Sequence, residues 1–213
     1  TDIDHFIHVL LSYAKSTKLP MAVHWDHGRS LEIVSHAVEL GFTSLMIDGS
    51  AYSFEENIRR TKEVVDRFKP LGYTIEAELG HVGNETDYEK ALASYSYTDP
   101  DLAAEFVERT GIDALAVAIG NLHGAYSAPP RINFDILEKV RKNVSVPLVL
   151  HGASGIGDED IRHCIELGIT KINIHTELCE AALIAVESHT PAESYLALNQ
   201  GYALRCVSAP RKK

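Results

Sequence analysis

Short apolar segments alternate with amphipathic segments along most of the chain. The apolar segments lack a regular alternation of polar and apolar positions, which is typical of parallel strands that are covered on both faces. We therefore expect a series of buried strands. The predicted strands are Met21–Trp25, Ser44–Asp48, Tyr73–Glu78, Ala114–Ile119, Pro147–His151 and Lys171–Ile174.

The segments between these strands have the periodicity of amphipathic helices. In the segment that follows the first strand, Leu31, Val34, Ala37 and Val38 share one face. Gly41, at the end of this segment, is typical of a left-handed helix C-cap, and Gly72, Gly111 and Gly168 stand at equivalent joints. The predicted helices cover residues 30–40, 54–69, 99–110, 133–142, 158–167 and 177–187, and an earlier helix runs from Phe6 to Ala14.

A strand followed by a helix thus recurs six times. This repeat predicts a parallel sheet with helical crossovers, which either closes into a barrel or stays open as a doubly wound sheet. No Gly-x-Gly-x-x-Gly follows the first strand, so the dinucleotide-binding version of the open sheet has no support. A full (β/α)8 barrel needs eight units and about 250 residues. This chain shows six units and has 213 residues.

Composition and charge narrow the class of protein. The chain has 213 residues, 45% of them hydrophobic and 23% charged, which predicts a single domain over residues 1–213. A net charge of −10 argues against nucleic acid or an anionic membrane as the main partner. Backbone N–H groups can still hold an anionic metabolite in a local pocket.

Targeting and redox signals favour a cytoplasmic protein. No window approaches the about 20 apolar residues that span a bilayer, and the chain does not start with a signal-peptide pattern. Cys164, Cys179 and Cys206 follow no Cys-x-x-Cys spacing, so we expect three reduced packing residues.

Polar residues gather where the predicted strands end. The carboxyl ends of parallel barrel strands converge on one rim, which carries the active site. A single histidine at a strand end is usually a capping or core residue, but three at different strand ends favour a metal site. His27, His123 and His151 form a zinc-type set that leaves the fourth coordination position open. The other polar residues at these ends are Asp26, Asp48, Glu78, Asn121, Asn173 and His175.

The segment after the fifth predicted strand has the composition of an anion-binding turn. Gly152-Ala153-Ser154-Gly155 combines flexible backbone with a hydroxyl group. Asn173 and Thr176, at the next strand end, can complete this nest. The acidic start of the following helix, Asp158-Glu159-Asp160, is an argument against it, because carboxylates compete for the positive helix end.

Six motifs in order resemble the class II fructose-1,6-bisphosphate and tagatose-1,6-bisphosphate aldolases. The resemblance covers about residues 19–177 and implies a (β/α)8 TIM barrel, with the first two βα units apparently absent from this chain and a shortened C-terminal arm from Ser194. It also implies a homo-oligomer, a dimer or a tetramer. The motifs are Val23-His24-Trp25-Asp26-His27, Met46-Ile47-Asp48, Glu76-Ala77-Glu78-Leu79-Gly80, Asn121-Leu122-His123-Gly124-Ala125-Tyr126, Leu150-His151-Gly152-Ala153-Ser154-Gly155 and Lys171-Ile172-Asn173.

The resemblance also implies a role for each site residue. The Zn²⁺ ligands are His27, His123 and His151, and Asp48 and Glu78 match acidic positions that can hold an alternative zinc site. Asp26 matches the catalytic aspartate. A monovalent cation, Na⁺ or K⁺, is typical near the phosphate loops. The positions that match phosphate-binding residues for a ketose phosphate or triose phosphate are Gly124, Gly152, Ser154, Asn173 and Thr176.

Two departures from the family pattern concern the chemistry. A loop glutamate moves the proton at the nucleophilic carbon, and the candidate here, Glu85, stands one place earlier than usual in Gly83-Asn84-Glu85-Thr86-Asp87. Fructose-type enzymes often have Lys after His-Gly-x-Tyr, whereas Ser127 follows Tyr126 here. The second departure favours a tagatose-type substrate over a fructose-type one and leaves other phosphorylated ketoses open.

Two other functions fit the same residues. A zinc-dependent hydrolase on this architecture would use a metal-bound hydroxide, and fold alone does not decide between the two. A non-catalytic aldolase-like subunit would keep the barrel to stabilise a partner, which the shifted Glu85 favours and the retained histidines with Asp26 oppose.

Overall fold

The strands form one parallel sheet. The computed structural model describes residues 2–82, 95–124, 126 and 130–187. In this part of the chain, neighbouring strands pair in the order in which they occur in the sequence, and every pair is parallel. The strands are β1 (His24–Gly28), β2 (Ser44–Ile47), β3 (Thr74–Leu79), β4 (Ala114–Val117), β5 (Leu148–Leu150) and β6 (Ile169–Ile172).

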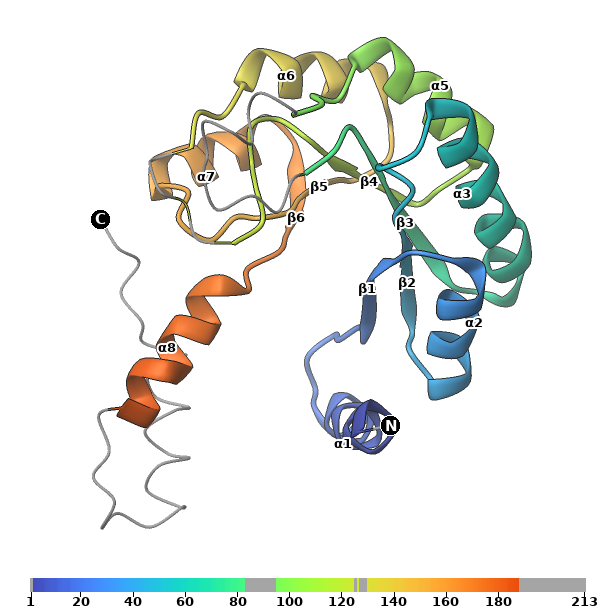
Figure 1. Cartoon of the computed structure of the whole chain (residues 1–213), viewed down its shortest axis with the longest axis vertical. Coiled ribbons are helices and arrows are strands. Elements are labelled where there is room, and N and C mark those ends of the chain that lie inside the picture. Colours follow the sequence, from blue (N-terminus) through green and yellow to red (C-terminus); the bar gives the residue numbers. More distant parts are fainter. Residues whose placement is uncertain (1, 83–94, 125, 127–129, 188–213) are drawn as a thin grey trace.

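Helices connect successive strands along the outer side of the sheet. Figure 1 shows the sheet curled into an arc, with α2, α3, α5, α6 and α7 around its outside and α8 extending away from it. The curl favours the barrel architecture over a doubly wound sheet, so the described part is an α/β half-barrel. The helices are α1 (Asp2–Ser16), α2 (Leu31–Leu40), α3 (Phe54–Phe68), η1 (Lys69–Leu71, a 3-10 helix), α5 (Pro100–Thr110), α6 (Phe134–Asn143), α7 (Asp158–Glu166) and α8 (Thr176–Glu187).

Local sequence signals set the helix ends. Side chains of Ser30, Ser53, Asp99 and Asn133 accept hydrogen bonds from N–H groups in the first turns of α2, α3, α5 and α6. The predicted glycine joints are confirmed, because Gly41, Gly72, Gly111 and Gly168 all have positive φ.

The first and last strand boundaries were predicted wrongly. Strand β1 begins at His24 rather than Met21 and continues to Gly28, and its pairing with β2 is irregular between Trp25 and Gly28. His27 lies in this irregularity with φ 51°. The apolar pattern could not show a bulge that places polar residues inside the strand. Strand β6 begins at Ile169 rather than Lys171, directly after Gly168 closes the preceding turn.

The two faces of the sheet have different compositions. The outer face packs against the helices in the main core, to which β4 contributes Leu115 and Val117 and β3 contributes Ala77. The alternate residues point to the inner face, where Met46, Ala116 and Val149 form a separate small cluster. The inner residues of β3 are Glu76 and Glu78, both buried. The half-barrel interior is therefore partly acidic.

Within the described residues, no helix has both the length and the apolar character needed to cross a membrane.

The main core predicts a large effect for Leu115→Ala. This side chain is 0% exposed, so its truncation should reduce the free energy of unfolding by about 2–5 kcal/mol. Leu102→Ala on α5 is the matched control, because Leu102 is 37% exposed. Urea unfolding checks both variants. Equal losses would contradict the placement of the core between sheet and helices.

Candidate active site

The predicted site residues meet at the carboxyl ends of the strands. A pocket of about 600 Å³ opens there. His151 and Glu78 lie buried beside it, with exposures of 0% and 1%. Glu85 lies outside the described residues. The pocket is lined by Asp26, His27, Asp48, His123, Gly124, Gly152, Ser154, Asn173 and Thr176, and also by Arg29, Ser50, Ala51, Tyr52, His81, Val82 and His175.

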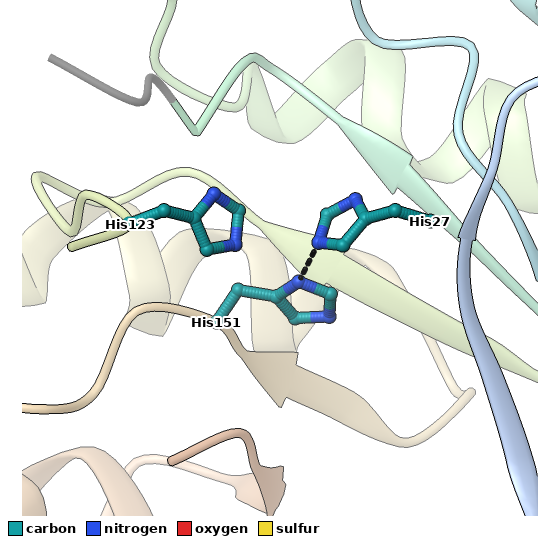
Figure 2. A group of neighbouring side chains, drawn as sticks. All are labelled: His27, His123 and His151. Atoms are coloured by element: carbon teal, nitrogen blue, oxygen red, sulfur yellow. Dashed lines mark hydrogen bonds between the residues drawn. The ribbon is translucent and has the colours of Figure 1, made fainter. Parts of the chain in front are cut away.

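Three imidazole rings face one another at the centre of the site. His27 comes from β1, His123 follows β4 and His151 follows β5 (Figure 2). The ring of His27 lies 4.8 Å from that of His123 and 4.7 Å from that of His151, measured between centroids. One nitrogen of each ring lies within 4.8 Å of the others. The topology thus brings together residues from three separate βα units.

Carboxylates fix the outer nitrogens of two of these rings. His27 Nδ1 lies 2.9 Å from Asp48 Oδ2, and His151 Nε2 lies 2.9 Å from Glu76 Oε1. An ionised carboxylate only accepts hydrogen bonds, so each of these nitrogens carries a proton. The inner nitrogens, His27 Nε2 and His151 Nδ1, then both present lone pairs when the rings are neutral, and they lie 2.9 Å apart. Two lone pairs at this distance require a proton or a metal cation.

The charges of these groups agree with this arrangement. Burial raises the pKa of Asp48, but hydrogen bonds from His27 and Ser50 outweigh it and hold the pKa below its usual value. Burial lowers the pKa of His27, and the Asp48 hydrogen bond and the Asp26 charge reverse this, so the net pKa is raised. Burial and the two neighbouring histidines lower the pKa of His123 to about 4. The raised pKa of His27 thus agrees with a positive charge beside its ring, from a proton or from a metal.

The donor set suits zinc. Neutral imidazoles are common zinc ligands, and carboxylates behind them orient the rings. Glu76 is ionised because the His151 hydrogen bond and the Lys171 charge outweigh the effect of burial and hold its pKa at about 2. The residues that are present therefore fit the metal that the sequence predicts.

A second group of possible ligands adjoins the first. His27, Asp48 and Glu78 also bring ligand atoms close together. Burial, followed by the charge of Asp48, raises the pKa of Glu78 to about 8. Its Oε1 accepts a hydrogen bond from the Val82 N–H at 3.0 Å, whereas its buried Oε2 has no hydrogen-bond partner among the described residues. A cation beside Asp48 would favour the ionised form of Glu78.

Asp26 lies at the rim of the pocket, next to His27 in sequence. Its side chain is 46% exposed, and both carboxylate oxygens accept hydrogen bonds from Asn173 Nδ2, at 3.3 and 3.2 Å. This contact joins β1 to the segment after β6 on the open side of the arc. Asp26 is thus oriented, exposed to the pocket and able to exchange a proton with a bound molecule.

The predicted anion nest is only partly available. Ser154 Oγ accepts hydrogen bonds from the N–H groups of His175 and Glu177, each at 3.3 Å, and so holds the start of α8. The Gly155 N–H donates to Glu177 Oε1 at 3.0 Å. Gly152 has φ 60°, and a Cβ there would overlap the Leu122 carbonyl oxygen. The backbone is therefore built for a close approach, but Glu177 occupies one of its donors.

Two residues of the site had no predicted role. Glu76 contacts His151, and Ser50 Oγ lies 3.0 Å from Nδ1 of His81 at the pocket. Glu76 alternates with Glu78 along one strand, and this alternation was the available signal for it. Asn121, expected at the rim, is fully buried and donates from Nδ2 to the His151 carbonyl oxygen at 2.9 Å, so it supports the site from within.

Comparison with known proteins identifies close relatives of the chain. The uncharacterized protein YdjI of Escherichia coli (strain K12) is 62% identical over 189 residues, which are 89% of this chain and 68% of that protein. The crystal structure of the YdjI aldolase from Escherichia coli K12 matches with a TM-score of 0.86 and 53% identity, over 97% of this chain and 72% of that chain.

A more distant structure supports the fold, and a family model covers nearly all of the chain. The fructose-bisphosphate aldolase of Campylobacter jejuni matches with a TM-score of 0.73 and 24% identity, over 97% of this chain and 73% of that chain. The model of the family described as fructose-bisphosphate aldolase class-II matches residues 1–209. The chain therefore belongs to the class II fructose-bisphosphate aldolase family.

Proposed function

We propose that this aldolase is zinc-dependent and cleaves a ketose 1,6-bisphosphate, of the tagatose or fructose type, reversibly to dihydroxyacetone phosphate and glyceraldehyde 3-phosphate. The observation that carries the proposal is the convergence of His27 Nε2 and His151 Nδ1 beside His123, with both outer nitrogens held by carboxylates. Zinc bound by these three histidines would act as a Lewis acid on the ketone oxygen and lower the barrier to carbanion formation at the adjacent carbon.

Asp26 is the proton donor and acceptor for the aldehyde partner. In cleavage it takes the proton from the hydroxyl whose oxygen becomes the aldehyde, and in condensation it returns this proton. Asn173 orients the carboxylate through its two contacts. We assign the proton at the nucleophilic carbon to Glu85, which lies outside the described residues.

The phosphate group that remains on dihydroxyacetone phosphate binds at the turn after β5 and the start of α8. Gly124, Gly152, Ser154, Asn173 and Thr176 line this end of the pocket. Gly124 has open space where a Cβ would stand, so its backbone can approach a ligand without a side chain in between, whereas Gly152 packs against the Leu122 carbonyl oxygen. Glu177 must release the Gly155 N–H if that donor is to contact the phosphate. A monovalent cation near this turn and a homo-oligomeric assembly stay predictions.

The direct test is an aldol-cleavage assay with both sugar bisphosphates, before and after zinc is removed with a chelator. We expect cleavage that stops with the chelator and returns with added zinc, with a higher kcat/KM for tagatose 1,6-bisphosphate. Zinc binding without cleavage of either sugar would contradict the proposed reaction and favour a non-catalytic subunit or a zinc hydrolase. Cleavage that survives chelation would contradict the metal dependence.

Asp26→Asn should separate catalysis from metal binding. Loss of a positioned general acid and base typically reduces kcat by about 10²–10⁴-fold. Asp26 is not one of the proposed zinc ligands, so its substitution should leave the metal in place. We therefore expect a full zinc content and a low kcat. Glu159→Gln, an acidic position at the start of α7 outside the pocket, is the control and should keep wild-type kcat. A variant Asp26→Asn with wild-type kcat would rule out this role.

Zinc affinity should depend on pH through His27. Zinc needs the neutral ring, and the pKa of His27 is raised above 6.5. The protonated form therefore dominates below that raised pKa, where affinity should fall about tenfold per pH unit as binding releases one proton. Competition with a chromophoric chelator at several pH values measures this. In Asp48→Asn the transition should move to lower pH, and a pH-independent affinity in the wild type would contradict the assignment.

A further inference from the structure

A buried cluster of charged groups lies on the inner face of the sheet, beneath the three histidines. Its centre is Glu76 on β3, with an exposed fraction of 4%. Glu76 Oε1 accepts a hydrogen bond from His151 Nε2 at 2.9 Å. Glu76 Oε2 accepts a hydrogen bond from Lys171 Nζ at 2.7 Å. Each carboxylate oxygen thus has its own partner.

The cluster joins β3 to two strands, β5 and β6, that do not pair with it. Glu76 belongs to β3 and Lys171 to β6, and His151 follows β5. In the sheet register, Lys171 stands beside Val149, whose side chain belongs to the inner-face cluster. The lysine therefore reaches Glu76 across the concave face of the half-barrel. Its contact holds the carboxylate oxygen that His151 does not contact.

We propose that Glu76 is a positioning residue of the metal centre: it holds His151 in the tautomer whose Nδ1 faces His27, and Lys171 anchors Glu76 in this position. This inference rests on the proposed zinc function. Asp48 does the same for His27 through Nδ1, so each of the two rings is oriented by its own carboxylate. A carboxylate that accepts from a ligand imidazole sets both the ring orientation and the nitrogen that is free to bind the metal.

Two competing interpretations of the cluster explain less. His24, Asp26 and Glu76 bring ligand-type atoms together, and such a group could hold a metal of its own. However, the Lys171 ammonium already lies against Glu76, and a second cation there would be repelled. A purely structural ion pair between Glu76 and Lys171 would account for one carboxylate oxygen and leave the hydrogen bond from His151 to the other without a role.

His24 completes the surroundings of the carboxylate. Its Nδ1 lies 2.8 Å from Ser44 Oγ, and Thr74 Oγ1 donates to the same hydroxyl. The Ser44 hydroxyl, which accepts from Thr74, is able to donate to His24 Nδ1, and a neutral His24 then carries its proton on Nε2. This nitrogen lies 3.7 Å from Glu76 Oε2 and 3.8 Å from Asp26 Oδ1. This nitrogen has no hydrogen-bond partner among the described residues, so His24 faces the two carboxylates without a hydrogen bond to either.

The test measures zinc affinity and histidine tautomers rather than turnover. In Glu76→Gln, we expect the zinc dissociation constant to rise about 10–100-fold, as measured by chelator competition. Lys171→Met keeps the carboxylate and should give a smaller rise in the same direction. The control is Glu138→Gln, which removes an exposed carboxylate paired with Lys142 at 2.9 Å on α6 and should leave zinc affinity unchanged.

Nitrogen NMR of ¹⁵N-labelled histidine supplies a readout that a merely structural ion pair would not move. In the metal-free wild type, His151 should carry its proton on Nε2, and Glu76→Gln should populate the other tautomer. Melting temperatures of the metal-free variants separate any loss of folding. If Glu76→Gln does not fold, Lys171→Met carries the test on its own.

The outcomes separate the two proposals. The positioning role would be overturned if Glu76→Gln kept both the zinc affinity and the His151 tautomer of the wild type. If only Lys171→Met folds, the same result in that variant would overturn it. A wild type that binds no zinc would instead overturn the proposed function, whereas the tautomer measurement would still decide whether Glu76 orients His151.

Discussion

The site depends on one close approach, that of His27 Nε2 and His151 Nδ1 at 2.9 Å. Neither ring can turn away from it easily, because Asp48 and Glu76 hold the outer nitrogens. The approach is repulsive for two neutral rings, so the folded chain favours a cation at this point, either a proton on His27 or a metal. The folded chain therefore has an affinity for a cation between these two rings.

The parallel sheet makes this approach possible. Residues of β1 and β3 and of the segments after β2, β4 and β5 meet only because these strands lie side by side with their carboxyl ends at one edge. The inner face carries Glu76 and Glu78 beside the small apolar cluster of Met46, Ala116 and Val149, and Lys171 and the histidines lie against these carboxylates. Stability and chemistry therefore share the same residues, since a buried carboxylate needs partners whether or not substrate is bound.

Periodicity and glycine joints were sufficient to predict the repeated βα units and most element boundaries. The histidines and Asp26 were found because strand ends of a parallel sheet converge and because their motifs resemble a known family. The bulge at His27 was not predictable, since it depends on how β1 pairs with β2. The links from Glu76 to His151 and from Lys171 to Glu76 join residues 75 and 95 positions apart. Such contacts depend on the curl of the sheet, which local sequence does not encode.

The phosphate end shows the same limit. The Gly-Ser turn after β5 was predicted as an anion nest, and two of its residues, Gly152 and Ser154, line the pocket. Sequence could not show that Glu177, on the next helix, takes the Gly155 N–H. The Gly155 N–H is therefore already hydrogen-bonded. A phosphate can bind to it only by replacing the Glu177 carboxylate.

X-ray absorption at the zinc edge of the zinc-loaded wild-type protein identifies the atoms that bind the metal. A zinc ion held by the three histidines should show three imidazole nitrogens at about 2.0–2.1 Å, with the multiple-scattering pattern of histidine rings. Spectra dominated by carboxylate oxygen, or with at most one imidazole, would contradict it, because His27, His123 and His151 would then not form the metal centre.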